Sequence, residues 1–221
     1  MKPAFTAIFD MDGVLVDNFN WHLKAWEMFC KRYKKHISDE EFRTHVFGGN
    51  NPDHLRYIFG QDISSELIER YSNEKEQLYR ELYAGNIQAV NGLIPLLEEL
   101  RASYIPMAIA TSAERQNVDY ILEAIGCNSY FSVIADASMI SKGKPDPEVF
   151  LKAAELSQAD IDECIVFEDS LKGIEAALRA RMKVVGVATT HHYAELTEAH
   201  HVITDFTEID YSGLCRLIKH P

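Results

Sequence analysis

The stretch AIFDMDGVLVDN, residues 7–18, places three aspartates close together behind an apolar run. Asp10 and Asp12 are separated by one residue, so in an extended chain their side chains point to the same side. One carboxylate of such a pair can attack an electrophile such as phosphorus, while the other moves protons to and from the reacting oxygens. Short motifs of this kind also arise by chance, so other segments must support the interpretation.

Further polar residues follow apolar runs elsewhere in the chain. They are Thr111 and Ser112 after residues 105–110, Lys144 in the loop after residues 132–135, and Glu168 and Asp169 after residues 164–167. The carboxyl ends of parallel strands share one edge of a sheet, so we expect these side chains to converge with Asp10 on one crevice.

That crevice would bring up to four carboxylates together, from Asp10, Asp12, Glu168 and Asp169. Clustered carboxylates without a partner are costly, so we expect a divalent cation, and ligands that are all oxygen favour Mg²⁺. Lys144 adds a positive charge, and Thr111 adds a hydroxyl group near the start of a helix, where phosphate binds readily. Together these groups predict a site for a transferring phosphoryl group.

Each of these residues also has an ordinary structural interpretation. Thr111 could cap a helix, as could Ser170, and Lys144 could be a loop residue next to a proline. Glu168 and Asp169 could form a solvated turn. The coincidence of four segments, each with suitable residue types after an apolar run, favours the functional interpretation.

Six short, nearly continuous apolar runs predict a parallel sheet that is covered on both faces. They are residues 5–9, 105–110, 132–135, 164–167, 184–188 and 201–204. Apolar residues with helical spacing lie between them, such as Leu93, Leu96, Leu97 and Leu100. This alternation predicts an α/β fold with a doubly wound parallel sheet.

The segment after the first run interrupts this rhythm. From about Asn18 to Gln88 we find helical spacing and charged stretches but no convincing strand. We therefore expect a small α-helical cap domain at residues 17–89, inserted into a core of residues 1–16 and 90–221, and we expect it to cover the carboxyl end of the first strand. Asp17 would lie at the entry to the cap, outside the chemistry.

Composition limits the possible partners and locations. The chain has 221 residues with a formal net charge of -12, which argues against nucleic acid and anionic membranes as partners. No apolar run is long enough for a membrane span, and the N-terminal residues do not resemble a signal peptide. The 4 cysteines are far apart and typical of a reducing compartment. We expect a cytoplasmic protein that is a monomer or a weak homo-oligomer.

The motifs FDMDGVLVD, IATSA, KGKPDPEVF and VFEDSLKGIEAALRARMKVVGV, in this order, resemble the haloacid dehalogenase (HAD) superfamily of hydrolases. The closest resemblance is to the subgroup with a small helical cap that contains β-phosphoglucomutase and many sugar-phosphate phosphatases. The resemblance covers both ends of the chain, and the insertion between them has the size and place of the cap. It implies a Rossmann-like core, Mg²⁺ as cofactor and a small phosphorylated substrate.

The resemblance also implies roles for individual residues. Asp10 matches the nucleophile, which is also a metal ligand, and Asp12 matches the general acid/base, whose backbone carbonyl binds the metal. Asp169 matches a further metal ligand, and Glu168 matches an acid that binds the metal directly or through water. The presence of Asp12 argues against the dehalogenases of the superfamily, which lack this residue.

Other matches concern the substrate. Thr111 and Lys144 match the hydroxyl and the lysine that hold the phosphoryl group, and we expect Ser112 to assist them. In the insertion, His22 matches a hinge histidine of β-phosphoglucomutase and Lys75 matches a lysine that contacts its substrate. His22 could equally be an ordinary residue on a helix face.

Two departures from β-phosphoglucomutase bear on the reaction. Asn51 stands where that enzyme has an arginine that grips a second phosphate. After the second motif, that enzyme has a Ser-Lys-Asn run, where this chain has Ala113, Glu114 and Arg115. A weaker second phosphate site makes water the favoured acceptor, so we expect a phosphatase with an aspartyl-phosphate intermediate. The alternatives are a β-phosphoglucomutase and, outside enzymology, a non-catalytic HAD-fold module that binds a ligand or a partner.

Overall fold

A computed structural model describes residues 3–219 of the chain. It divides into two compact units, one made of the residues up to Asp17 and from Gln88 onward, and the other of Asn18–Ile87. We refer to them as the core unit and the helical unit and describe each by itself. The helical unit begins one residue later and ends two residues earlier than the cap expected at residues 17–89. That the helical unit covers the site stays a prediction.

The core unit contains a six-stranded sheet with the order β3-β2-β1-β4-β5-β6, in which all pairs are parallel. The strands are β1 (Thr6–Phe9), β2 (Met107–Ala110), β3 (Val133–Ala135), β4 (Cys164–Glu168), β5 (Lys183–Val187) and β6 (His201–Ile203). Each lies within two residues of an apolar run, so the expected doubly wound α/β fold is confirmed. The strand order reverses at β1, because β2 lies on one side of it and β4 on the other.

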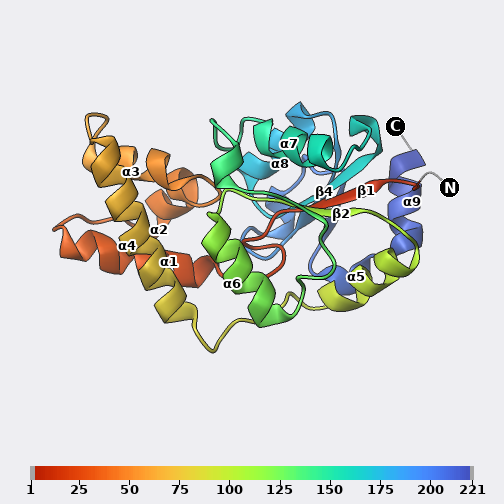
Figure 1. Cartoon of the computed structure of the whole chain (residues 1–221), viewed down its shortest axis with the longest axis horizontal. Coiled ribbons are helices and arrows are strands. Elements are labelled where there is room, and N and C mark those ends of the chain that lie inside the picture. The colour runs from red at the N-terminus through yellow and green to blue at the C-terminus, as the bar shows by residue number, and fades with distance from the viewer. Residues whose placement is uncertain (1–2, 220–221) are drawn as a thin grey trace. The chain divides into compact units, whose positions relative to one another are not determined.

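Helices cover both faces of this sheet, which explains why its strands are apolar on both sides. The helices are α5 (Leu93–Ala102), α6 (Arg115–Ile125), α7 (Glu148–Leu156), α8 (Leu171–Arg179) and α9 (Tyr211–Lys219). α7 and α8 lie on one face, and α5, α6 and α9 lie on the other (Figure 1). Ile8 and Val166 pack in the cluster beneath α7 and α8. Their neighbours Phe9 and Phe167 stack with ring centroids 4.5 Å apart.

The helical unit is built from four α-helices and a π-turn, and no strand occurs among its residues 18–87. The helices are α1 (Phe19–Arg32), α2 (Asp39–Glu41), α3 (Asn51–Phe59) and α4 (Ser65–Tyr83). The π-turn, η1, is a short π-helix at Phe42–Val46. Side chains cap three of them: Ser38, Asn50 and Ser64 each accept a hydrogen bond from the first turn of the helix that follows. The absence of a strand agrees with the sequence pattern.

Aromatic side chains form much of the core of the helical unit. Phe29 and Tyr71 lie with ring centroids 5.5 Å apart, and Phe59 packs against both. Phe19 and Phe42 make a second such contact, at 5.1 Å. These rings join α1, α3 and α4, so the unit has its own packed interior.

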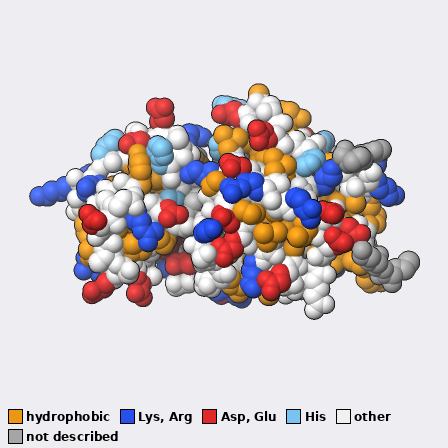
Figure 2. Space-filling view, turned by 90° about the horizontal axis from the view of Figure 1, so that it is seen from above, with side chains coloured by type: hydrophobic (Ala, Val, Ile, Leu, Met, Phe, Trp, Pro, Cys, Tyr) orange, Lys and Arg blue, Asp and Glu red, His pale blue; other side chains and the backbone are white. Residues whose placement is uncertain are grey.

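The described surface carries charges of both signs. Acidic and basic side chains are interspersed on the face that Figure 2 displays, without a large patch of one sign. Among residues 3–219, no helix is both long and apolar enough to cross a membrane.

Candidate active site

The parallel register brings the expected site residues to one edge of the sheet. Phe9 lies opposite Ile109 in β2 and Phe167 in β4, so the residues that follow these three positions leave the sheet together. The backbone N–H of Asp10 donates to the carbonyl of Phe167 over 3.0 Å, which ties the start of one loop to the end of the next strand. Thr111 follows β2 at the same edge.

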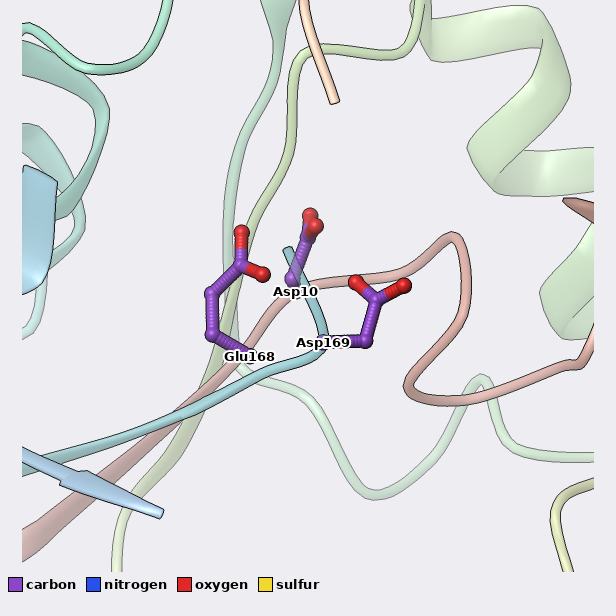
Figure 3. Close-up of side chains that lie close together, drawn as sticks. All are labelled: Asp10, Glu168 and Asp169. Carbon is purple, nitrogen blue, oxygen red and sulfur yellow. The ribbon is translucent and has the colours of Figure 1, made fainter. Parts of the chain in front are cut away.

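Three carboxylates converge at this edge. Oxygens of Asp10, Glu168 and Asp169 all lie within 4.8 Å of one another, and all three residues are buried. Figure 3 shows their side chains extending from the end of β1 and the end of β4 toward a common space. The sequence placed these residues in one crevice, and the structure brings them together.

Lys144 lies against two of these carboxylates. Its Nζ is 2.8 Å from Asp10 Oδ2 and 2.6 Å from Glu168 Oε1, and 1% of its side chain is exposed. The ammonium group also lies 4.9 Å from the centre of the Phe150 ring. Lys144 is therefore held inside the site by its surroundings and is not an ordinary loop residue.

The acidic residues of the site differ in the direction in which their pKa is shifted. Burial raises the pKa of Asp10 to about 8; the Lys144 charge opposes this rise and the Glu168 charge adds to it. Burial acts in the same direction on Glu168, but the Lys144 charge and hydrogen bonds from Lys144 and the Ser170 N–H outweigh it, so the pKa of Glu168 is lowered. Burial, and then the charges of Glu168 and Asp10, raise the pKa of Asp169 well above its usual value.

Without a divalent cation, the free energy of unfolding should fall as the pH rises from about 5 toward 8. Above pH 5 an unfolded aspartate has lost its proton, whereas the folded Asp10, with a pKa of about 8, still holds one. The folded state then binds more protons, so its stability falls with rising pH, by at most about 1.4 kcal/mol per pH unit for one such group. The raised pKa of Asp169 acts in the same direction and adds to this fall. The pKa of Glu168 is lowered and that of Lys144 is raised, so neither of these two groups titrates in this window.

Urea unfolding in EDTA between pH 5 and 8 measures this slope. Asp10→Asn removes one of the two carboxyl groups with a raised pKa, so it should reduce the slope. Mg²⁺ should flatten the profile of the unmodified protein, because a cation favours the ionised carboxylates. Parallel profiles for the variant and the unmodified protein in EDTA would contradict the assignment.

The site fits a divalent cation. Three carboxylates face one lysine, so the ionised cluster carries excess negative charge. Asp10 Oδ1 and Asp169 Oδ1 are buried and accept no hydrogen bond from any described residue. Carboxylate oxygens with these properties suit a hard cation such as Mg²⁺. The expected contribution of Asp12 is a backbone carbonyl, which the side-chain cluster does not include, so that ligand stays a prediction.

Two glycines leave room for the carboxylates. At Gly13, where φ is +77°, a Cβ atom would lie 2.0 Å from Asp169 Oδ2. At Gly173, in the first turn of α8, a Cβ atom would lie 1.6 Å from Glu168 Oε1. Sequence reasoning missed Gly173. Both positions need glycine because the acidic side chains occupy the space of a Cβ.

Thr111, Ser112 and Asp12 stand nearby with different surroundings. Thr111 is buried, and its hydroxyl accepts a hydrogen bond from the N–H of Ala113 over 3.1 Å, so it stabilises a turn and does not cap α6. Ser112 Oγ is buried and has no hydrogen-bond partner among the described residues. Asp12 is half-buried, and its negative charge contributes to the raised pKa of Asp10. The helix-capping interpretation holds for Ser170, whose Oγ accepts from the N–H of Gly173.

A fifth segment, which sequence reasoning missed, also reaches the site. It consists of residues 189–191, just beyond β5. The hydroxyl of Thr189 donates to the carbonyl of Gly13, and that of Thr190 donates to Asp169 Oδ2. His191 Nδ1 lies 3.1 Å from the Asp169 carbonyl, which only accepts, so this nitrogen carries the proton. The strand-end rule applied to the fifth apolar run would have found these residues.

Comparison with known proteins agrees with this arrangement. A family model described as haloacid dehalogenase-like hydrolase matches residues 7–187, which is more than half of the chain. The chain belongs to the haloacid dehalogenase-like hydrolases. Within this family it falls in the β-phosphoglucomutase-like subgroup with a small helical cap, as the sequence motifs indicated.

Solved structures of this family resemble the chain over nearly its whole length. A family IA, variant 3 HAD hydrolase from Entamoeba histolytica has a TM-score of 0.88 at 32% identity and covers 98% of this chain and 100% of its own. A β-phosphoglucomutase from Clostridium difficile has a TM-score of 0.87 at 26% identity, and the match covers 97% of this chain and 96% of that enzyme's chain.

Curated relatives in the family include phosphatases. A chloroplastic 5-amino-6-(5-phospho-D-ribitylamino)uracil phosphatase from Arabidopsis thaliana is 30% identical over 212 residues, which are 96% of this chain. The match spans 57% of the length of that relative. A phosphorylated carbohydrates phosphatase from Thermotoga maritima is 29% identical over 185 residues, with 81% of this chain and 83% of the relative covered.

The helical unit of this HAD-like hydrolase contains a buried polar network around Lys75. Lys75 Nζ lies 3.0 Å from His22 Nδ1 and 2.7 Å from Glu76 Oε1, and Asn51 Nδ2 donates to the same Glu76 oxygen over 2.8 Å. His22 stacks on Tyr79 with ring centroids 3.9 Å apart. The sequence singled out His22, Lys75 and Asn51 separately. The structure brings these three residues together in one network.

Glu76 was not foreseen as part of this network. Its burial opposes ionisation, but the charges of Lys75 and His22 and the hydrogen bonds from Lys75 and Asn51 outweigh it and lower the pKa of Glu76 to about 2. The carboxylate is thus ionised and neutralises Lys75 inside the unit. Residue types on one helix cannot show which neighbour a lysine pairs with, so the sequence carried little signal for this contact.

Proposed function

We propose that this chain is a Mg²⁺-dependent phosphatase that hydrolyses a small phosphorylated metabolite, in particular a sugar phosphate. The observation that carries the proposal is the buried cluster of Asp10, Glu168 and Asp169 around Lys144, with two carboxylate oxygens that no described residue hydrogen-bonds. The names of the relatives support the class of substrate: one is a phosphatase of phosphorylated carbohydrates and another acts on a phosphoribitylamino compound.

In the proposed mechanism, Asp10 is the nucleophile. Its carboxylate attacks phosphorus, the bond from phosphorus to the ester oxygen breaks, and the leaving oxygen takes a proton from Asp12. Lys144 holds Asp10 Oδ2 at 2.8 Å and so fixes the direction of the carboxylate. The products of this step are the free alcohol and an aspartyl phosphate on Asp10.

The second step returns the enzyme to its starting state. The carboxylate of Asp12 takes a proton from water, the water oxygen bonds to phosphorus, and the bond between phosphorus and Asp10 breaks to release inorganic phosphate. Thr111, Ser112 and Lys144 bind the phosphoryl oxygens. Asp10, Asp169 and the backbone carbonyl of Asp12, with Glu168 directly or through water, would hold Mg²⁺, which would supply positive charge to the phosphoryl oxygens.

The network in the helical unit favours hydrolysis over a mutase reaction. A mutase must hold the second phosphate of a bisphosphate, which requires positive charge away from the nucleophile. Lys75 is neutralised by Glu76, and Asn51, which stands where β-phosphoglucomutase has an arginine, donates to the same carboxylate. Arg115 is paired with Asp119 over 2.8 Å on α6. The positive charge of Lys75 is therefore already compensated inside the helical unit.

Incubation with β-glucose 1-phosphate, a bisphosphate primer and Mg²⁺ tests this choice. We expect free phosphate and no glucose 6-phosphate, and Glu76→Gln should raise turnover of a sugar bisphosphate relative to the monophosphate by about tenfold, because it removes a negative charge from the network. Glu69→Gln, which changes an exposed glutamate on α4, is the matched control.

The other outcomes separate the alternatives. Glucose 6-phosphate as the main product would favour the mutase, for which the meeting of His22 and Lys75 is the supporting observation. A panel of sugar phosphates, nucleotides and pyrophosphate from which no phosphate is released with Mg²⁺ present would favour the non-catalytic module.

A further inference from the structure

Thr190 is fixed against the carboxylate of Asp169. Its side chain is buried, and its hydroxyl donates to Asp169 Oδ2. The backbone carbonyl of Asp169 also lies 3.2 Å from this hydroxyl and accepts from His191 Nδ1 over 3.1 Å. Side chains of two consecutive residues thus hold both the backbone and the carboxylate of one acidic residue.

The same carboxylate oxygen is enclosed on another side. Asp169 Oδ2 lies where a Cβ atom of Gly13 would be, at 2.0 Å, so the backbone at Gly13 packs against it. The hydroxyl of Thr189 donates to the Gly13 carbonyl, so the segment after β5 also holds this loop. Asp169 Oδ2 is therefore occupied by protein contacts, whereas Oδ1 is buried and accepts no hydrogen bond from a described residue.

We propose that Thr190 is a positioning residue that makes Asp169 offer a single oxygen to the cation and so selects Mg²⁺ over Ca²⁺. Mg²⁺ requires near-octahedral geometry, keeps bound water and takes few carboxylate oxygens from the protein. Ca²⁺ takes six to eight oxygens and readily accepts both oxygens of one carboxylate. A carboxylate with one oxygen held by a hydroxyl can turn less freely into the two-oxygen arrangement that Ca²⁺ prefers.

The proposal goes beyond the phosphatase assignment and rests on one part of it, that the cluster binds a divalent cation. Thr190 is not expected to touch substrate. It acts through Asp169, so its loss should change cation affinity and selectivity first and the chemical step at saturating Mg²⁺ much less.

The experiment measures cation binding directly on the whole protein without substrate. Mn²⁺ binding is followed by the electron paramagnetic resonance signal of the free ion, and Mg²⁺ and Ca²⁺ are then titrated as competitors. Thr190→Val keeps the branched shape but lacks the hydroxyl, Thr190→Ser keeps the hydroxyl, and Thr204→Val alters an exposed threonine in the same unit as a control.

We expect Thr190→Val to bind Mg²⁺ about 10- to 100-fold more weakly, the usual effect of losing a group that orients a metal ligand. Its affinity for Ca²⁺ should fall by much less, so the preference for Mg²⁺ over Ca²⁺ drops at least about tenfold. Thr190→Ser and Thr204→Val should match the unmodified protein. Circular dichroism and melting in EDTA check that each variant is folded.

Three outcomes would overturn the proposal. Equal losses of Mg²⁺ and Ca²⁺ affinity in Thr190→Val would show a general structural role, unchanged affinities would show no role, and failure of Thr190→Ser to restore selectivity would show that the hydroxyl is not responsible. If the unmodified protein binds no divalent cation, the phosphatase assignment fails as well. If it binds Mg²⁺ but releases no phosphate from any substrate, the selectivity comparison still decides the role of Thr190.

Discussion

Asp10→Asn is expected to reduce phosphate release by roughly 10⁴-fold or more, because the amide cannot form the aspartyl phosphate and water has no equivalent route. The fold should survive the change. Burial holds the pKa of Asp10 at about 8, so the charged carboxylate is the disfavoured form in the absence of a cation. A neutral amide of the same size should therefore leave the melting temperature in EDTA unchanged or higher. Phosphate release and thermal melting, measured side by side, separate chemistry from stability.

The matched control for this variant is Asp17→Asn. Asp17 belongs to the same DxD-containing stretch but is exposed and lies outside the carboxylate cluster. The activity of the Asp17→Asn variant should therefore stay close to that of the unmodified protein. Acid-quenched protein labelled from a ³²P-labelled substrate should carry phosphate in the unmodified protein and in Asp17→Asn but not in Asp10→Asn. Near-normal hydrolysis by Asp10→Asn would reject the proposed nucleophile.

Lys144→Met is expected to lower both stability and activity. Its ammonium group lies 2.8 Å from Asp10 and 2.6 Å from Glu168, with almost no exposure to water. Loss of one partner of a buried ion pair leaves charge uncompensated and typically costs roughly 3–5 kcal/mol. Loss of a positive group beside the phosphoryl oxygens should reduce kcat by roughly 10²- to 10³-fold.

A divalent cation should reverse part of the stability loss in Lys144→Met. Mg²⁺ supplies positive charge to the same carboxylates, so it should raise the melting temperature of the variant by more than that of the unmodified protein. Lys142→Met is the control, because the Lys142 side chain is 71% exposed and two residues away in sequence. A variant that melts like the unmodified protein in EDTA would show that Lys144 is not needed to compensate the cluster.

Much of the core unit could be predicted because its physical causes are local. Six apolar runs became six parallel strands, since a strand covered on both faces must be apolar on both. Where a strand begins later than its apolar run, burial extends beyond the ladder hydrogen bonds. Phe5 is buried but precedes β1, and Ile105 is buried but precedes β2.

The convergence of Asp10, Glu168 and Asp169 was also accessible from the sequence. In a parallel sheet the ends of neighbouring strands meet at one edge, so residue type and position after a strand were enough to place them together. Lys144 was harder, because a lysine in a loop can point to solvent. Its contacts with Asp10 and Glu168 depend on the path of the loop that precedes α7.

The sequence by itself determined the family, the α/β core with its helical insertion, and the acidic residues that gather at the end of β1. Tertiary structure alone decided which partners those residues take: Thr190 on Asp169, Gly173 beneath Glu168, and Glu76 on Lys75. The physical reason is that periodicity and strand order report which residues are buried and where a strand ends. Hydrogen-bond and ion-pair partners instead depend on loop paths and side-chain rotamers, which bring together groups that are distant in the chain.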